Sequence, residues 1–230
     1  MLNLIPRFNL DYNFSDLCHA IKCIIANETT DLRHIEAIFG KRPIFFTDCG
    51  RTSLYIILKA LKLPKGAKVG VPLYSCTVVF DAIIKAGYNP YFIDIELDNY
   101  TIDLQDLEKK IREIDALVVI HTFGRPADMD EVKKIAADKP IVEDCAHSLL
   151  SKYKGKITGT LGFTSFFSLS KYISSAGGGM IVLNENKFRD QFQKEIELLS
   201  NSIFAEFWRI FKSYIYSLLY HKPWFGLLFS

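Results

Sequence analysis

The sequence predicts an α/β protein with a mainly parallel, doubly wound sheet and helices on both of its faces. Short apolar runs alternate with segments whose apolar residues recur at helical spacing, from about residue 43 onward. One run, residues 116–121, is apolar at nearly every position, which is typical of a strand in the centre of a parallel sheet. With 230 residues, 49% of them apolar, the chain can bury a sizeable core.

Charge and cysteine content argue against several classes of protein. The net charge is +2 with both signs mixed along the chain, and no basic stripe alternates with aromatic residues, so a nucleic-acid polymer is not expected as a partner. The five cysteines are scattered without a C-x-x-C pair. This pattern indicates reduced thiols in a cytoplasmic protein and predicts neither a disulfide framework nor a metal site. No secretory signal is apparent at the N-terminus.

The elements are expected in the following order. Leu17, Ile21 and Ile24 recur at helical spacing and predict a helix at 14–26, started by Asn13 or Ser15. Strands are expected at 43–47, 68–72, 89–95 and 116–121, with helices that end near residue 62 and lie at 78–85, 104–111 and 129–137. We predict three segments: an N-terminal arm at 1–30, a large domain at 31–200 and an aromatic-rich helical tail at 201–230.

Polar residues follow the apolar runs at the points where the predicted strands end. The turn at 48–52, His121, Asp144 and Lys171 all occupy such positions. Ligands of doubly wound sheets bind beyond the carboxyl ends of the strands. These residues are therefore expected to share one site.

The turn after the first strand has the composition of an anion site. Gly50 permits close approach of the backbone, and Thr52 adds a hydroxyl donor at the start of a helix, where free amides and the helix dipole favour a negative charge. We assign this turn to a phosphate, with Arg51 as a further ligand or as a solvent-facing side chain. The alternative is an ordinary helix cap.

Lys171 and Asp144 suggest a specific cofactor. Lys171 follows the run at 166–170 and precedes a flexible glycine run at 177–179, and Asp144 ends the apolar run that begins at Ile141. A lysine can form a Schiff base with a carbonyl cofactor, and an acid can keep a pyridine nitrogen protonated. Pyridoxal 5′-phosphate (PLP) needs both. The alternative for Lys171 is a surface lysine in a loop.

The motifs together resemble the DegT/DnrJ/StrS family of PLP-dependent nucleotide-sugar aminotransferases, from about residue 45 to 184. The resemblance rests on the segments Gly50-Arg51-Thr52-Ser53-Leu54, Phe92-Ile93-Asp94-Ile95, His121-Thr122-Phe123-Gly124-Arg125-Pro126-Ala127-Asp128-Met129-Asp130, Glu143-Asp144-Cys145-Ala146-His147 and Lys171 with its glycines.

The resemblance implies a fold, an activity and an assembly. It implies the aspartate-aminotransferase-like fold and a homodimer that transfers an amino group, with glutamate as donor, to a nucleotide-linked keto sugar of polysaccharide or antibiotic biosynthesis. Lys171 would be the covalent anchor and the acid–base group, with burial lowering its pKa. Asp144 would pair with the ring nitrogen, and His147 would contact the ring oxygen or serve as a structural histidine.

The sequence departs from the family pattern at two site positions. Cys76 occupies the place of an aromatic residue that stacks on the cofactor ring, and Tyr74, two residues away, is expected to point to the other side if the segment is extended. Phe166 occupies the place of the usual phosphate serine, which leaves Ser165 and Ser168 as candidates.

The tail is the third departure, because its sequence leads us to expect that the small C-terminal domain of the family is absent or truncated here. Residues 201–230 are rich in aromatic and aliphatic side chains but carry Glu206, Arg209 and Lys212. They predict either a helix that docks on the large domain or a partner, or an amphipathic helix that contacts a membrane surface. The alternative function is a catalytically impaired family member that binds PLP or a partner without turnover.

Overall fold

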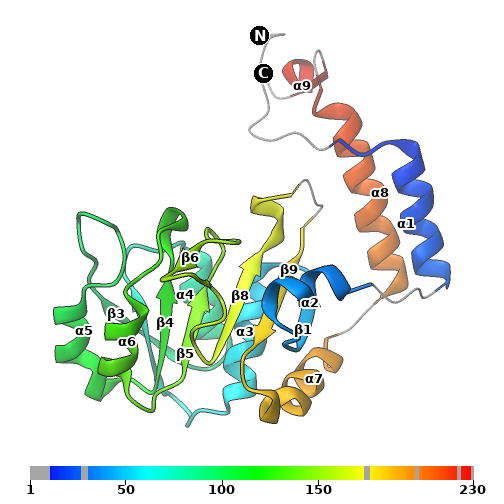
Figure 1. Cartoon of the computed structure of the whole chain (residues 1–230). Helices are drawn as coiled ribbons and strands as arrows, with labels where there is room; N and C mark the ends of the chain where they lie inside the picture. The colour runs from blue at the N-terminus through cyan, green and yellow to red at the C-terminus, as the bar shows by residue number, and fades with distance from the viewer. Residues whose placement is uncertain (1–10, 27–30, 174–176, 200–201, 222–223, 229–230) are drawn as a thin grey trace. The chain divides into compact units, whose positions relative to one another are not determined.

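The computed structural model describes residues 11–26, 31–173, 177–199, 202–221 and 224–228. The chain divides into two compact units (Figure 1). The larger unit contains residues 33–172 and 177–198 and holds the sheet. The smaller unit contains the described residues near both ends of the chain, including helices α1 (Phe14–Ala26), α8 (Ile203–Leu219) and α9 (Trp224–Leu228).

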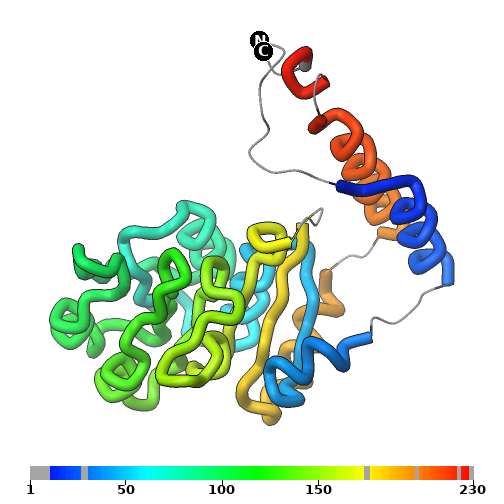
Figure 2. The backbone as a smooth tube through the Cα atoms, turned by 45° about the horizontal axis from the view of Figure 1, so that its top comes forward, coloured from blue at the N-terminus to red at the C-terminus, as the bar shows by residue number. Residues whose placement is uncertain are grey.

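The larger unit is built on a seven-stranded sheet in the order β1-β9-β8-β5-β4-β2-β3, whose strands run side by side (Figure 2). All neighbouring pairs from β8 to β3 are parallel, whereas β9 is antiparallel to both β8 and β1. The prediction of a mainly parallel doubly wound sheet is confirmed. The strands are β1 (Ile44–Thr47), β2 (Lys68–Pro72), β3 (Asn89–Ile93), β4 (Ala116–Ile120), β5 (Ile141–Asp144), β8 (Thr164–Ser168) and β9 (Gly179–Leu183), and a separate hairpin is formed by β6 (Lys152–Tyr153) and β7 (Lys156–Ile157).

Helices cover both faces of the sheet, as predicted. On one face α3 (Gly50–Leu61) packs on β8 and β9 and is flanked by α4 (Thr77–Lys85) and α7 (Arg189–Glu197). On the other face, α5 (Leu104–Lys110) and α6 (Met129–Ala136) pack on β4 through a buried apolar cluster. The same face is covered near β8 and β9 by α2 (Arg33–Phe39), whose Phe39 packs on Phe167 with ring centroids 5.3 Å apart. Four short 3₁₀ turns complete the described elements: η1 (Ile111–Glu113), η2 (Thr122–Gly124), η3 (Leu169–Lys171) and η4 (Asn186–Phe188).

Helix boundaries follow the capping residues read from the sequence. Asn13 Oδ1 accepts a hydrogen bond from the Asp16 amide at 3.1 Å, and the Asn13 amide donates to Asp16 Oδ2 at 2.9 Å, so α1 begins at Phe14 with two satisfied amides. Asp128 Oδ1 accepts from the Glu131 amide at 3.3 Å and starts α6.

The sequence did not predict α2, β9 or the β6–β7 hairpin.

The glycine run has a steric role that differs from the predicted flexibility. The Gly178 amide donates to the Asp48 carbonyl at 2.6 Å. A Cβ atom on Gly179 would lie 2.4 Å from the carbonyl carbon of Cys49. The described glycines therefore allow the turn before α3 to lie directly against the start of β9.

In the smaller unit α1 and α8 pack against each other, although the sequence analysis treated them as separate segments. The Tyr12 amide donates to Ser217 Oγ at 2.8 Å, and Ser217 Oγ donates to the Tyr12 carbonyl at 3.1 Å. The rings of Phe14 and Tyr214 meet edge to face with centroids 6.5 Å apart. None of the described helices combines the length and the apolar character that crossing a membrane requires.

Candidate active site

A cavity of about 420 Å³ lies at the carboxyl ends of the parallel strands, next to the starts of α3 and α4. This is the edge at which the sequence predicts a shared site. The cavity is lined by seven of the predicted site residues: Gly50, Arg51, Cys76, Asp144, His147, Ser168 and Lys171.

Two residues expected near the ligand lie elsewhere. The Thr52 hydroxyl is 3.4 Å from Cys49 Sγ, and Thr52 does not line the cavity. His121 is fully buried on the opposite face of the sheet. The alternation of side chains along a strand explains its position, because Ile120, the preceding residue, faces the cavity.

The helix that starts at the cavity begins with a glycine for a packing reason. A Cβ atom on Gly50 would lie 3.3 Å from both the Phe167 carbonyl oxygen and Ser168 Cβ. Gly50 thus lets the start of α3 approach the end of β8. The first amides of this 12-residue helix lie at the cavity together with the exposed Arg51.

Asp144 is a buried carboxylate at the end of β5, with 5% of its surface exposed. Its Oδ1 accepts a hydrogen bond from the Ala146 amide at 2.9 Å. Burial raises the pKa of Asp144, and this hydrogen bond and the positive charge of Lys171 oppose the shift. A buried carboxylate is stabilised when a cation or a donor pairs with it, so a ligand in the cavity with a protonated nitrogen would suit this position.

Lys171 meets His147 at the cavity, with 3.0 Å between Nζ and Nε2. Desolvation lowers the pKa of His147, and the neighbouring charge of Lys171 lowers it further. The side chain of His147 is exposed overall, but one ring face is shielded by Phe123. Neutral His147 accepts from the Lys171 ammonium through Nε2. The expectation that Lys171 itself is buried is wrong, since η3 places it on the surface of the site.

An aromatic wall, which the sequence analysis missed, borders the cavity. The rings of Phe123 and His147 stack with centroids 5.9 Å apart and an interplanar angle of 7°. Tyr74 lies 6.4 Å from Phe123 and 5.5 Å from Tyr100, centroid to centroid. Phe123 adopts a left-handed backbone conformation with φ 54°, which is uncommon for a bulky residue and positions its ring beside His147.

The prediction that Tyr74 points away from Cys76 is wrong, because both residues line the cavity. The Ser75 amide donates to the Leu73 carbonyl at 2.9 Å, so the chain bends here. The two-residue alternation of an extended strand therefore does not apply to this loop.

Ser165 and Ser168 have different surroundings. Ser165 is fully buried on the far face of β8, and its Oγ donates to the Gly159 carbonyl at 2.9 Å. Ser168 lines the cavity, as does Phe166 two residues earlier. Of the two candidate serines, only Ser168 is placed to contact a ligand there.

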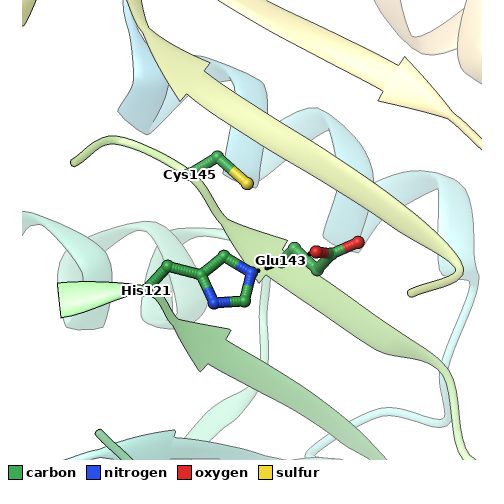
Figure 3. A group of neighbouring side chains, drawn as sticks. All are labelled: His121, Glu143 and Cys145. Carbon is green, nitrogen blue, oxygen red and sulfur yellow. Dashed lines mark hydrogen bonds and ion pairs between the residues drawn. The ribbon is translucent and has the colours of Figure 1, made fainter. Parts of the chain in front are cut away.

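A second polar cluster, His121, Glu143 and Cys145, lies buried on the opposite face of the sheet, with polar atoms within 4.8 Å of one another (Figure 3). His121 Nδ1 accepts from the Ala127 amide at 3.2 Å, so Nε2 carries the proton and donates to Glu143 Oε2 at 3.0 Å.

The surroundings of this cluster favour a structural role over a metal site. Glu143 also accepts backbone hydrogen bonds of 2.6–2.8 Å from three amides, those of Gly159, Leu161 and Gly162. Burial, assisted by the negative charge of Glu143, raises the pKa of the Cys145 thiol well above its usual range. Metal ligation requires a thiolate and a free imidazole nitrogen, whereas here the thiol stays protonated and both nitrogens of His121 are engaged.

Comparison with known proteins identifies the family. Residues 33–210 match the model of the DegT/DnrJ/EryC1/StrS aminotransferase family. The chain belongs to this family. The family resemblance predicted from the sequence is thereby confirmed.

Individual relatives agree with this assignment. The chain is 34% identical over 147 residues to a GDP-perosamine synthase of Escherichia coli O157:H7, a match that covers 62% of this chain and 40% of that protein. The fold resembles that of a GDP-4-keto-6-deoxymannose-3-dehydratase solved with a trapped PLP-glutamate geminal diamine (TM-score 0.71, 22% identity, 83% of this chain and 54% of that one). It also resembles the sugar aminotransferase CalS13 from Micromonospora echinospora (TM-score 0.69, 22% identity, 83% and 57%). The chain thus spans about two fifths of the length of the curated relative.

Proposed function

We propose that this chain forms the cofactor-binding part of a PLP-dependent aminotransferase that transfers an amino group from glutamate to a nucleotide-linked keto sugar. The observation that carries the proposal is the meeting of Asp144, Lys171 and the start of α3 in one cavity. Membership of the aminotransferase family supports the reaction class. A GDP-perosamine synthase among the relatives supports the sugar substrate, and the PLP-glutamate adduct trapped in a structural neighbour supports the glutamate donor.

The chemistry of the cavity fits the three ends of PLP. The buried carboxylate of Asp144 suits a protonated ring nitrogen. The amine of Lys171 suits the aldehyde, and the first amides of α3, with Arg51 and Ser168 beside them, suit the phosphate. The volume of about 420 Å³ is in the range of small-molecule sites.

Each residue then has a defined task. When bound, PLP supplies an electron sink for the carbanion of the amino donor. Lys171 would hold the cofactor through Nζ and, once released, would accept and return a proton at the same atom. His147 accepts a hydrogen bond from Nζ and orients it. Asp144 keeps a positive charge on the ring nitrogen by remaining ionised opposite it.

The proposal includes a cytoplasmic homodimer. The family resemblance supports the dimer, and the five free, scattered cysteines are typical of a reducing compartment. Sedimentation equilibrium of the purified chain measures its oligomeric state directly, and a monomer at all concentrations would remove the dimer from the proposal.

Borohydride reduction tests the anchor. The protein is incubated with PLP, reduced, digested and analysed by mass spectrometry. We expect the mass of the reduced cofactor on the peptide that contains Lys171. Lys171→Ala should lose the label, and the matched surface variant Lys65→Ala should keep it. A label that persists in Lys171→Ala, or that is spread over surface lysines, would contradict the proposal.

A half-reaction with glutamate then separates turnover from binding. With PLP bound and no sugar acceptor present, the proposed enzyme would release 2-oxoglutarate from glutamate, at most one equivalent per site. Cofactor attachment without release of 2-oxoglutarate would instead support a family member that binds PLP without turnover.

A further inference from the structure

Three aromatic rings from three separate loops meet at the mouth of the cavity. Tyr74 follows β2, Tyr100 lies between β3 and α5, and Phe123 follows β4. The ring centroids are 5.5 Å apart for Tyr74 and Tyr100, 6.4 Å for Tyr74 and Phe123, and 6.2 Å for Tyr100 and Phe123. We call these three residues the ring cluster. Because β4, β2 and β3 are parallel neighbours in the sheet, their carboxyl ends bring the three loops together.

The ring cluster is open to solvent although part of its backbone is strained. The exposed fractions are 49% for Tyr74, 42% for Tyr100 and 64% for Phe123. Tyr100 and Phe123 have left-handed backbone conformations, with φ 59° and 54°, which cost free energy in residues with bulky side chains. Rings this exposed recover only part of that cost through packing. Strained residues of this kind are concentrated at ligand sites.

The loop that carries Tyr100 is held in a fixed conformation. The Tyr100 amide donates to the Glu96 carbonyl at 2.8 Å, and the Glu96 amide donates to the Thr101 carbonyl at 2.9 Å. Arg125 Nη1 donates to the Asp98 carbonyl at 3.3 Å and so ties this loop to the segment after η2. The rings are therefore positioned before a ligand arrives, which lowers the entropy cost of binding.

The ring cluster and the proposed cofactor residues occupy successive strands along one edge of the sheet. Lys171 follows β8 and Asp144 ends β5, whereas the rings follow β4, β2 and β3, the next strands in the sheet. Neighbouring strands are about 4.8 Å apart, so the strands that lead to Asp144 and Tyr100 are separated by roughly 15 Å. Tyr74 and Phe123 line the same cavity as Lys171 and Asp144. One elongated ligand can thus reach both the lysine amine and the rings.

From this arrangement we propose that the ring cluster stacks on the base of the nucleotide-linked sugar, an inference that rests on the proposed function. The hexose must lie beside Lys171 for its carbonyl carbon to react. In a nucleoside diphosphate sugar, two phosphates and a ribose separate the hexose from the base, so the base lies at the outer end of the site. Aromatic side chains bind bases by stacking, because every base has a flat π face.

The lining of the cavity favours a base over a hexose at the rings. The hydroxyl groups of a hexose need polar partners when they leave water. Among the described residues that line the cavity, Asp144 provides the only carboxylate and no side chain provides an amide. Asp144 lies at the cofactor end, on β5. The rings therefore suit the flat face of a base.

Binding of nucleoside diphosphates to the full chain tests the proposal. Guanosine diphosphate and uridine diphosphate are titrated by calorimetry, with ribose 5-diphosphate as the probe that lacks a base. We expect both nucleotides to bind at least about tenfold more tightly than ribose 5-diphosphate, because stacking adds to the contacts of the ribose and phosphates. In saturation-transfer NMR, the base protons should receive more saturation from the protein than the ribose protons.

Matched variants connect binding to the ring cluster. Tyr100→Asn and Phe123→Asn each remove one ring and introduce a residue that tolerates a left-handed conformation, so the loops should keep their shape. We expect each variant to weaken nucleotide binding at least about fivefold, whereas Tyr100→Phe should keep it. Leu97→Asn, a change at an 80% exposed position of the same loop, should leave nucleotide binding unchanged. Urea unfolding of each variant distinguishes a lost contact from a lost fold.

Two results would overturn the assignment of the ring cluster. The first is equal affinity for the nucleotides and ribose 5-diphosphate, or binding of none of them. The second is nucleotide binding that folded Tyr100→Asn and Phe123→Asn proteins retain in full. Nucleotide binding is measured without PLP, and labelling of Lys171 by PLP is measured without nucleotide. A chain that binds nucleotides through its rings but is not labelled would therefore contradict the proposed function and not the ring cluster.

Discussion

Lys171 and His147 form a hydrogen-bonded pair at the mouth of the cavity, with 3.0 Å between Nζ and Nε2. The ring of Phe123 stacks on His147 and limits its rotation. Because Nε2 accepts from the ammonium, the imidazole proton lies on Nδ1. The pair therefore fixes both the direction of the lysine amine and the tautomer of the histidine.

The first prediction concerns the titration of His147. Its pKa is lowered by desolvation and by the charge of Lys171, so Lys171→Ala should move the pKa part of the way back toward the ordinary value of about 6.5. Histidine C–H resonances followed by NMR across pH 4–9, without cofactor, measure the shift. Lys152→Ala, an exposed change on the hairpin, should leave His147 unaffected. An unchanged or lower pKa in Lys171→Ala would contradict the assigned pairing.

The same pair predicts a dependence of stability on pH. Since the pKa of His147 is lower in the native state, the unfolded chain binds the proton first as pH falls through about 6.5. The contribution of His147 to stability is therefore present above that pH and declines below it. The decline should be smaller in Lys171→Ala, as measured by urea unfolding at pH 5 and pH 8.

The second prediction is that Asp144→Asn stabilises the cofactor-free protein and weakens PLP binding. Burial raises the pKa of Asp144 in the native state. The free energy of unfolding therefore falls as pH rises from the ordinary pKa of about 3.9 to the native pKa. Above the native pKa, the full cost of keeping the buried carboxylate ionised is present. Asparagine keeps an acceptor for the Ala146 amide and removes the charge. We expect a gain on the order of 1 kcal/mol at pH 7 by urea unfolding.

A control and a binding measurement complete this test. Asp138→Asn, a change at an exposed position, should alter stability by less than about 0.5 kcal/mol. The affinity of Asp144→Asn for PLP should fall at least tenfold, because the amide cannot stabilise a protonated ring nitrogen as a carboxylate does. A less stable Asp144→Asn protein that retains its PLP affinity would contradict the role assigned to Asp144.

The alternation of strands and helices allowed the sequence to predict the sheet and the edge on which the cavity lies. Asp144 and Lys171 were identified because a charged residue directly after an apolar strand is unusual unless it meets a ligand. His121 was misplaced because the sequence does not reveal which residue of the strand faces the cavity. That register follows from the pairing of Ile120 with Asp144 on neighbouring strands.

The features that the sequence did not reveal depend on contacts between distant segments. Phe123 joins the site through a left-handed turn that no spacing rule specifies. Tyr74 lines the cavity because of a bend after β2. The antiparallel strand β9 can lie beside the end of β1 because Gly179 fits against Cys49. Each depends on tertiary structure more than on local propensity.

The third prediction concerns the buried carboxylate of Glu143, which accepts from His121 and from three backbone amides. In Glu143→Gln, the new NH₂ group would face donors at Gly159 and His121. We expect a loss of roughly 3 kcal/mol of stability in urea unfolding, since buried donors are left unpaired.

The control for this change is Glu131→Gln, which removes the charge of a partly exposed glutamate that pairs with Lys134. Exposed pairs of this kind contribute less than about 1 kcal/mol. Equal urea-unfolding midpoints for Glu143→Gln and Glu131→Gln would show that the hydrogen bonds of Glu143 do not stabilise the loop at 159–162.

The last prediction compares two glycines: Gly179, where close packing leaves no room for a Cβ atom, and Gly87, where only the backbone conformation favours glycine. A Cβ atom on Gly179 would lie 2.4 Å from backbone atoms of Cys49, so alanine there must push the turn before α3 away from β9. We expect Gly179→Ala to lose roughly 2–3 kcal/mol of stability. Gly87 has φ +94° but no atom within 4 Å of an added Cβ, so Gly87→Ala should lose only about 1 kcal/mol, from strain alone.

The two variants should also differ in cofactor binding. The turn displaced in Gly179→Ala leads directly into Gly50 and Arg51 at the cavity, whereas Gly87 does not line it. PLP affinity, measured by the label on Lys171, should therefore fall in Gly179→Ala and stay unchanged in Gly87→Ala. If both variants lost stability equally and kept the label, the glycine run would be a flexible connection and not the packing contact that holds the start of α3 at the site.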